Sequence, residues 1–103
     1  MSEALNTIHW IMKDFCEANK LKLETEYRII PERKFRWDYA IPSLKVGFEF
    51  QGGIYMGKSG HSNIKGQARD QEKMNLAQLA GWRILQYNAV NYASIEEHLK
   101  QLL

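Results

Sequence analysis

The sequence predicts an α/β domain in which helices flank a mixed sheet, with the element order α-β-β-β-α-β and a short final helix. Three observations predict this class. A helical apolar pattern opens the chain, three strand-like segments follow it directly, and a second helical pattern then precedes a fourth strand. Such an order gives an antiparallel meander and a helical crossover that brings the last strand alongside. A length of 103 residues fits a single domain, which we place at 1–103.

The first helix is predicted over residues 3–19, where apolar residues recur at helical spacing. Cys16 belongs to this pattern, and we expect a small core residue there, since a lone cysteine excludes an internal disulfide. The tryptophans also stand at apolar positions. We therefore expect Trp10, Trp37 and Trp82 to lie in the core.

Three strands are predicted from segments rich in β-branched and aromatic residues, at residues 24–30, 34–41 and 45–51. Pro31 and Pro42 mark the turns between them. A glycine-rich loop is predicted over 52–66, and loops of that length in compact domains are functional or disordered in most cases.

The second half of the chain is predicted to hold a helix over 67–80, capped at its carboxyl end by Gly81, and a strand over 82–87. Ser94 and Glu97 have the spacing of a capping box, which predicts the start of a last short helix.

The alternation of apolar residues predicts how the strands pair. Matching apolar to apolar requires partner numbers in the second and third strands that sum to an odd value. The turn at Pro42 to Lys45 suggests a sum of 87, which pairs Tyr39 with Phe48 and Trp37 with Phe50. The same reasoning pairs Tyr27 with Trp37 and Ile29 with Phe35. On the opposite, polar face, three carboxylates then form a row. They are Glu26, Asp38 and Glu49, with Ala40 and Gly47 beside them.

Carboxylates in neighbouring strands, about 5 Å apart at their β-carbons, destabilise a sheet unless something compensates their charge. A shared Mg²⁺ or Mn²⁺ ion would do so, because hard divalent cations prefer oxygen ligands. The chain has no Cys/His spacing typical of a zinc site. The alternative is a solvated face on which Asp38 pairs with Arg28 or Arg36 and Glu49 with a lysine.

These residues resemble the PD-(D/E)XK nuclease superfamily, in particular its small VRR-type, Holliday-junction-resolvase-like and very-short-patch-repair-like branches. The resemblance covers Glu26 to Tyr87 and rests on an ordered set of residues. They are Asp38, then Glu49-Phe50-Gln51, Gly52-Gly53, Gly60-His61, Asp70-Gln71-Glu72-Lys73-Met74-Asn75 and Gly81-Trp82. It implies a restriction-endonuclease-like core and a metal-dependent phosphodiesterase that hydrolyses DNA.

The resemblance also implies roles for individual residues. Asp38, Glu49 and the main-chain carbonyl of Phe50 would hold Mg²⁺ or Mn²⁺. Glu26, Gln51, His61 and Lys73 are the further candidate catalytic residues. Two positions depart from the family motif: Trp37 replaces its proline, and Gln51 replaces its lysine. Lys73 is the candidate to return the lost positive charge.

The charge pattern agrees with a polyanionic partner, because Glu26 to Arg83 hold ten Lys/Arg against six Asp/Glu. The candidate DNA-phosphate contacts are Arg33, Lys34, Arg36, Lys58, Lys65 and Arg69. No element looks built to read base edges, and the resemblance implies branched DNA as substrate. Cutting two strands with so short a chain would require a homodimer. The alternatives are a catalytically inert DNA-binding module and an accessory subunit of a larger nuclease or recombination complex.

The amino-terminal residues lack the layout of a signal peptide, and no apolar run approaches the ~18 residues that span a membrane. We therefore expect a soluble protein in the cytoplasm of a bacterial or phage-infected cell.

Overall fold

The computed structural model describes residues 3–50 and 64–103. In chain order its elements are α1 (Glu3–Ala18), β1 (Glu24–Tyr27), β2 (Trp37–Ile41), a 3₁₀ turn (Pro42–Leu44), β3 (Val46–Phe50), α3 (Ile64–Leu79), β4 (Arg83–Tyr87), a second 3₁₀ turn (Tyr92–Ser94) and α4 (Ile95–Lys100). The predicted α/β class and the predicted order of elements are confirmed.

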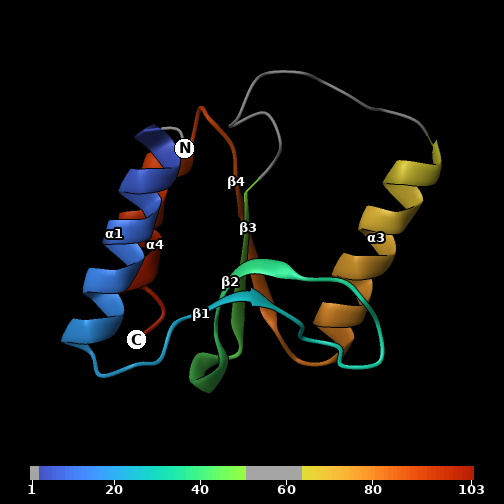
Figure 1. Ribbon diagram of the computed structural model, residues 1–103, viewed down its shortest axis with the longest axis horizontal. Helices are drawn as coiled ribbons and strands as arrows, with labels where there is room; N and C mark the ends of the chain where they lie inside the picture. Colours follow the sequence, from blue (N-terminus) through green and yellow to red (C-terminus); the bar gives the residue numbers. More distant parts are fainter. Residues whose placement is uncertain (1–2, 51–63) are drawn as a thin grey trace.

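The four strands form one mixed sheet in the order β1-β2-β3-β4. The first two pairs are antiparallel, and β3 pairs with β4 in parallel, as a helical crossover requires. Figure 1 shows α1 and α4 packed together on one side of the sheet and α3 on the other side. None of the helices in the described part of the chain has both the length and the apolar character needed to cross a membrane.

The predicted registers are confirmed where the strands pair. Tyr39 pairs with Phe48 and Ala40 with Gly47, and Tyr27 of β1 pairs with Trp37. The strands are shorter than predicted, however. The described ladders do not include the expected pairs Trp37–Phe50, Asp38–Glu49, Glu26–Asp38 and Ile29–Phe35.

Two groups of buried residues pack against the two faces of the sheet. The α1-side core joins α1 and α4 to one face and consists of Ile8, Met12, Cys16, Ile41, Val46, Phe48, Phe50, Tyr87, Ile95 and Leu99. The α3-side core consists of Ile29, Trp37, Ala40, Ala77 and Trp82. The face that the sequence predicted to be polar therefore carries a second, smaller core, and α3 packs over it.

The alternation predicted that Trp37 would share a face with Tyr39 and Ile41, but it does not. Trp37 is buried in the α3-side core, whereas Tyr39 and Ile41 pack in or against the α1-side core. Trp37 is the first residue of β2, and β1 departs from strand geometry beside it, since Glu26 has a φ of +49°. Side chains alternate between faces only in regular strand geometry, so the rule does not apply to a residue at such an irregular strand end.

Gly47 allows the α3-side core to close over the sheet. A β-carbon at this position would lie 3.1 Å from Ile84 Cδ1 and 3.2 Å from Ile29 Cδ1, which is tighter than normal packing. A methyl group at this position would therefore require Ile84 and Ile29 to shift by a few tenths of an ångström.

Three local predictions are corrected. The helix expected from residue 67 begins at Ile64, so the predicted loop is shorter at its carboxyl end. Ser94 makes no side-chain capping bond, because a 3₁₀ turn already leads into α4. Trp10 is 56% exposed and lies on the outer side of α1. The predicted cap at Gly81 is confirmed: its φ is +87°, and its N–H donates to the Gln78 carbonyl.

Candidate functional site

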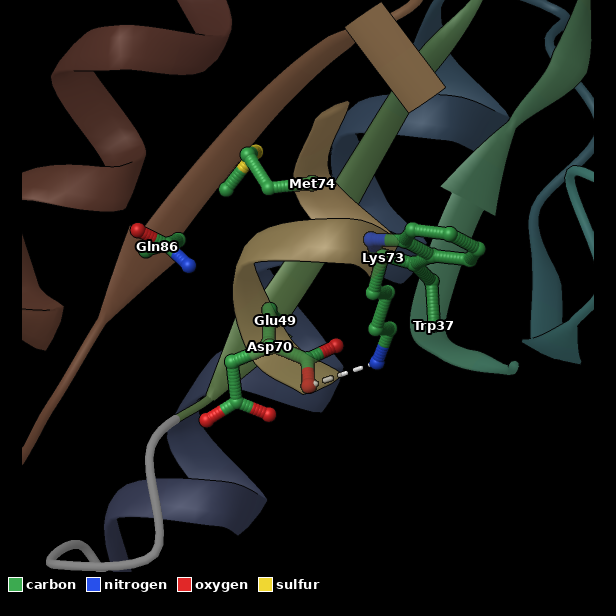
Figure 2. A pocket seen from close by; sticks show the side chains of 6 residues that line it. All are labelled: Trp37, Glu49, Asp70, Lys73, Met74 and Gln86. Atoms are coloured by element: carbon green, nitrogen blue, oxygen red, sulfur yellow. Dashed lines mark hydrogen bonds and ion pairs between the residues drawn. The ribbon is translucent and has the colours of Figure 1, made fainter. Parts of the chain in front are cut away.

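Glu49 and Lys73 form the centre of the candidate site. Glu49 lies on the α3-facing side of β3, and its Oε2 accepts a hydrogen bond from Lys73 Nζ of α3 at 2.9 Å (Figure 2). The side chains are only 26% and 17% exposed, respectively. Ala77 lies one helical turn after Lys73 and is fully buried, so its small side chain lets α3 approach the sheet closely enough for this contact.

The Lys73 ammonium has two further neighbours, both from the entry to β2. It donates a hydrogen bond to the main-chain carbonyl of Arg36 at 2.8 Å, and it lies 4.7 Å from the centre of the Trp37 ring. Lys73 thus meets a carboxylate, a carbonyl dipole and an aromatic face. These contacts fix an otherwise flexible side chain next to Glu49.

Asp38 lies at the point where the pairing of β2 with β3 ends. Its Oδ2 accepts a hydrogen bond from the Phe50 N–H at 2.8 Å. A carboxylate thus takes the main-chain donor that a longer ladder would have used. The same contact holds Asp38 beside the end of β3, where Glu49 is located.

Both carboxyl groups have raised pKa values. Burial raises the pKa of Glu49, as do the nearby charges of Asp38 and Asp70, while Lys73 opposes the shift. Burial also raises the pKa of Asp38, and the charge of Glu26 adds to this, against the hydrogen bond from Phe50. The ionised forms are therefore less stable here than in water.

A small pocket of about 70 Å³ lies between β3, β4 and α3. It is lined by Trp37, Glu49, Asp70, Lys73, Met74 and Gln86, and Figure 2 shows the Asp70 carboxylate beside that of Glu49. Glu49 Oε1 is buried and has no hydrogen-bond partner among the described residues. A buried carboxylate oxygen without a donor is costly, which makes this side of Glu49 a position for an additional positive group or donor.

The balance of charge points the same way. Asp38, Glu49 and Asp70 together with Lys73 have a formal charge of −2, which matches one divalent cation. In the described ranges no three His, Cys, Asp or Glu side chains converge closely enough to hold an ion by themselves. A cation would therefore rely on Asp38 and Glu49 and complete its shell with main-chain and water oxygens, as Mg²⁺ commonly does.

Known proteins bear on the fold. No protein-family model matches the chain, and no curated protein matches it. Among solved structures, the homing endonuclease I-Bth0305I catalytic domain matches with a TM-score of 0.59 and 16% sequence identity, over 92% of this chain and 88% of that one. The chain shares the fold of that catalytic domain. At this identity the similarity concerns the fold alone, and it agrees with the α-β-β-β-α-β core described above.

The sequence-predicted site residues are placed as follows. Asp38, Glu49 and Lys73 come together, and the main chain of Phe50 joins them. Glu26 is exposed, but its charge acts on Asp38. Gln51, Lys58 and His61 lie outside the described residues.

The alternative interpretation, a solvated face with separate ion pairs, fits the two carboxylates only in part. Glu49 pairs with a lysine, as in the alternative interpretation, but at a half-buried site rather than on a solvated face. Asp38 bonds to a main-chain N–H and to neither Arg28 nor Arg36 among the described hydrogen bonds.

Gln86 was not predicted from the sequence as a site residue. In the parallel ladder Gln86 of β4 is the partner of Glu49, and it lines the pocket. Two residues earlier in each strand, Gly47 pairs with Ile84, so Gln86 extends the polar row by one strand. That Gln86 shares a strand face with Ile84, two residues earlier, was visible in the sequence, but the register of a parallel strand was not.

Proposed function

We propose that this chain is a metal-dependent endonuclease that hydrolyses DNA phosphodiester bonds. The observation that carries the proposal is the pair of half-buried carboxylates, Asp38 and Glu49, with raised pKa values and with one oxygen of Glu49 lacking any donor among the described residues. Burial makes the ionised carboxylates costly, and a bound cation would offset that cost beyond what Lys73 already does. The fold shared with a homing endonuclease catalytic domain and the resemblance to the PD-(D/E)XK superfamily support the same function.

The metal would be Mg²⁺ or Mn²⁺, held by the carboxylates of Asp38 and Glu49 and the main-chain carbonyl of Phe50. Hard oxygen ligands and a formal charge of −2 suit such an ion. When bound, the metal would supply a water nucleophile of lowered pKa and stabilise negative charge on the reacting phosphate.

The protein's own groups would prepare the site for this chemistry. The Phe50 N–H fixes the direction of the Asp38 carboxylate. Lys73 keeps a positive charge next to Glu49, where it can attract a phosphate oxygen and offset charge that develops there. By resemblance, Gln51 and His61 would orient the water and assist the leaving group. Glu26 would be a further metal ligand or a water-orienting carboxylate.

The DNA backbone would lie along one flank of α3. Lys65, Arg69 and Glu72 follow one another at i, i+4 and i+7 and so share a helix face, and Lys65 and Arg69 are exposed. Glu72 accepts a hydrogen bond from Arg33 at 2.9 Å, which ties the segment before β2 to this flank. The exposed Lys34 and Arg36 of that segment extend the basic surface. Lys58, a further candidate phosphate contact, lies outside the described residues. Contacts of this kind bind phosphates without reading sequence.

We further propose branched DNA as the substrate and a homodimer as the active form. One chain offers one cleavage site, so cutting two strands in one event requires two copies. Light scattering on the protein with and without a four-way junction tests the dimer separately from catalysis.

A second candidate function is a catalytically inert DNA-binding module. It is favoured by the Lys73–Glu49 pair, because an ammonium already neutralises one oxygen of Glu49. Cleavage activity separates the two functions, because either kind of protein could bind Mn²⁺ and DNA.

The test is cleavage of single-stranded, duplex, flap and four-way DNA with Mg²⁺ or Mn²⁺, together with calorimetric titration of Mn²⁺. Glu49→Gln should abolish cleavage and weaken Mn²⁺ binding. Glu97→Gln, at a 70% exposed position of α4, is the matched control and should change neither. Mn²⁺ binding and DNA binding without cleavage would support the inert module. An unimpaired Glu49→Gln would refute the proposed mechanism.

A further inference from the structure

The ammonium of Lys73 is held by three groups of different chemistry. Glu49 Oε2 is 2.9 Å away, the Arg36 carbonyl oxygen is 2.8 Å away, and the Trp37 ring centre is 4.7 Å away. Only the first of these carries a charge. The carbonyl and the ring attract a cation by their dipole and quadrupole, and neither belongs to the proposed set of metal ligands.

This difference matters once Glu49 acquires another cation. A divalent ion on Glu49 would compete with Lys73 for the carboxylate and repel the ammonium. A lysine has four flexible methylenes and a strongly hydrated head, so a lysine held by Glu49 alone would move into solvent. The Trp37 ring and the Arg36 carbonyl would still attract it.

Trp37 is well placed for such a role. Its side chain is 1% exposed and packs with Ala40 and Ala77, so the ring has little freedom to turn. It directly precedes Asp38 in the chain and shares the pocket with Glu49. Figure 2 shows the ring beside the Lys73 side chain, on the side away from Gln86. Among aromatic residues, tryptophan is also the one that attracts cations most strongly.

We propose that Trp37 is a positioning residue that retains the Lys73 ammonium at the Asp38–Glu49 site when Glu49 binds a metal ion. This inference rests on the proposed nuclease function. It explains how Lys73 of α3 can supply the positive charge of the motif lysine, which Gln51 replaces two residues after Glu49. Trp37, the residue before Asp38, holds the Lys73 ammonium in place. Trp37 acts through Lys73 and not on the substrate.

The test is a double-mutant cycle. Trp37→Leu, Lys73→Met and the double variant are compared in metal-dependent cleavage, with Trp37→Phe as a variant that keeps an aromatic core. In the Lys73 background, Trp37→Leu should lower kcat about tenfold and leave the KM for DNA near its original value, and Trp37→Phe should lose less. In the Lys73→Met background, neither change at Trp37 should lower kcat further. Equal losses in both backgrounds would overturn the proposal, since they would mark Trp37 as a core residue only.

The same double-mutant cycle can be measured by urea unfolding in the presence of Mn²⁺, and this measurement does not depend on catalysis. We expect Trp37 and Lys73 to be coupled by about tenfold in the unfolding equilibrium constant, which corresponds to about 1.4 kcal/mol. If Trp37→Leu does not fold, the cycle with Trp37→Phe replaces it, with a smaller coupling of the same sign. An inactive wild-type protein with this coupling would refute the nuclease function but not the retention of Lys73. Loss of the coupling when Mn²⁺ is added would refute the retention, whatever the activity.

Discussion

Replacing Lys73 with methionine should destabilise the protein at pH 7 by about 2 kcal/mol. The change removes two hydrogen bonds of the ammonium, one to the Glu49 carboxylate and one to the Arg36 carbonyl, and keeps most of the aliphatic contacts. A hydrogen bond to a charged group contributes about 1.5–3 kcal/mol, and removing one partner of a fully buried pair costs about 3–5 kcal/mol. Because the two side chains are 17% and 26% exposed, solvent screening places the expected loss toward the lower figure.

The loss should also depend on pH. The pKa of Glu49 is raised in the folded protein, chiefly by burial, so its contribution to stability is full below the unfolded value and falls as pH rises through the folded pKa. Lys73 opposes that shift, and its removal raises the pKa of Glu49 further. The variant should therefore lose little stability at low pH, where Glu49 is protonated in both proteins, and progressively more as the pH rises through the raised pKa that Glu49 has in the folded wild-type protein.

Urea unfolding at pH 4, 5, 6, 7 and 8, without divalent metal, measures this effect. The control is Lys100→Met, the same substitution at an ion pair whose side chains are 68% and 70% exposed and whose atoms are 4.0 Å apart. That change should shift stability by less than about 0.5 kcal/mol at every pH. A pH-independent loss in the Lys73 variant, or a loss no larger than that of the control, would show that the ion pair does not stabilise the folded protein.

Three further outcomes are expected. Asp38→Asn should raise the melting temperature of the metal-free protein at pH 7, because burial disfavours the ionised carboxyl whereas asparagine can still accept a hydrogen bond from the Phe50 N–H. The same change should abolish stabilisation by Mn²⁺. A lower melting temperature of the metal-free variant would contradict the first expectation. Gly47→Ala should cost about 1–3 kcal/mol in urea unfolding, since its β-carbon would press on Ile84 and Ile29, and a neutral change would mean that the core adjusts freely. Arg69→Gln should weaken DNA binding to all sequences alike and reduce the slope of log affinity against log salt by about 1; an unchanged slope would remove Arg69 from the interface.

Local patterns in the sequence determined much of the fold. The period of 3.6 residues in the first helix and the alternation in the strands follow from backbone geometry, so the elements and the antiparallel registers could be predicted. The register summing to 87 is one such result, because a one-residue slip would have turned Phe48 out of the core. The apolar pattern, together with the turn at Pro42 to Lys45, therefore predicts Asp38 and Glu49 as neighbours.

The remaining features depend on contacts between residues distant in the chain. Trp10 and Trp37 have the same apolar character in the sequence, yet Trp10 is exposed and Trp37 is buried on the face opposite to the predicted one. No local period determines how far α3 covers the sheet. That docking brings Lys73 to Glu49, 24 residues away in sequence, and opens the pocket beside Gln86.

The order of elements, the pairing of the first three strands and the acidic pair at the end of that pairing could all be predicted from local patterns. Which positive group faces that pair, and which of its oxygens lacks a partner among the described residues, depends on how α3 packs on the sheet. Strand registers follow from matching short apolar patterns, and these are visible in the chain itself. The approach of a helix to a sheet instead depends on the size of a few side chains at their contact, such as the fully buried Ala77 of α3.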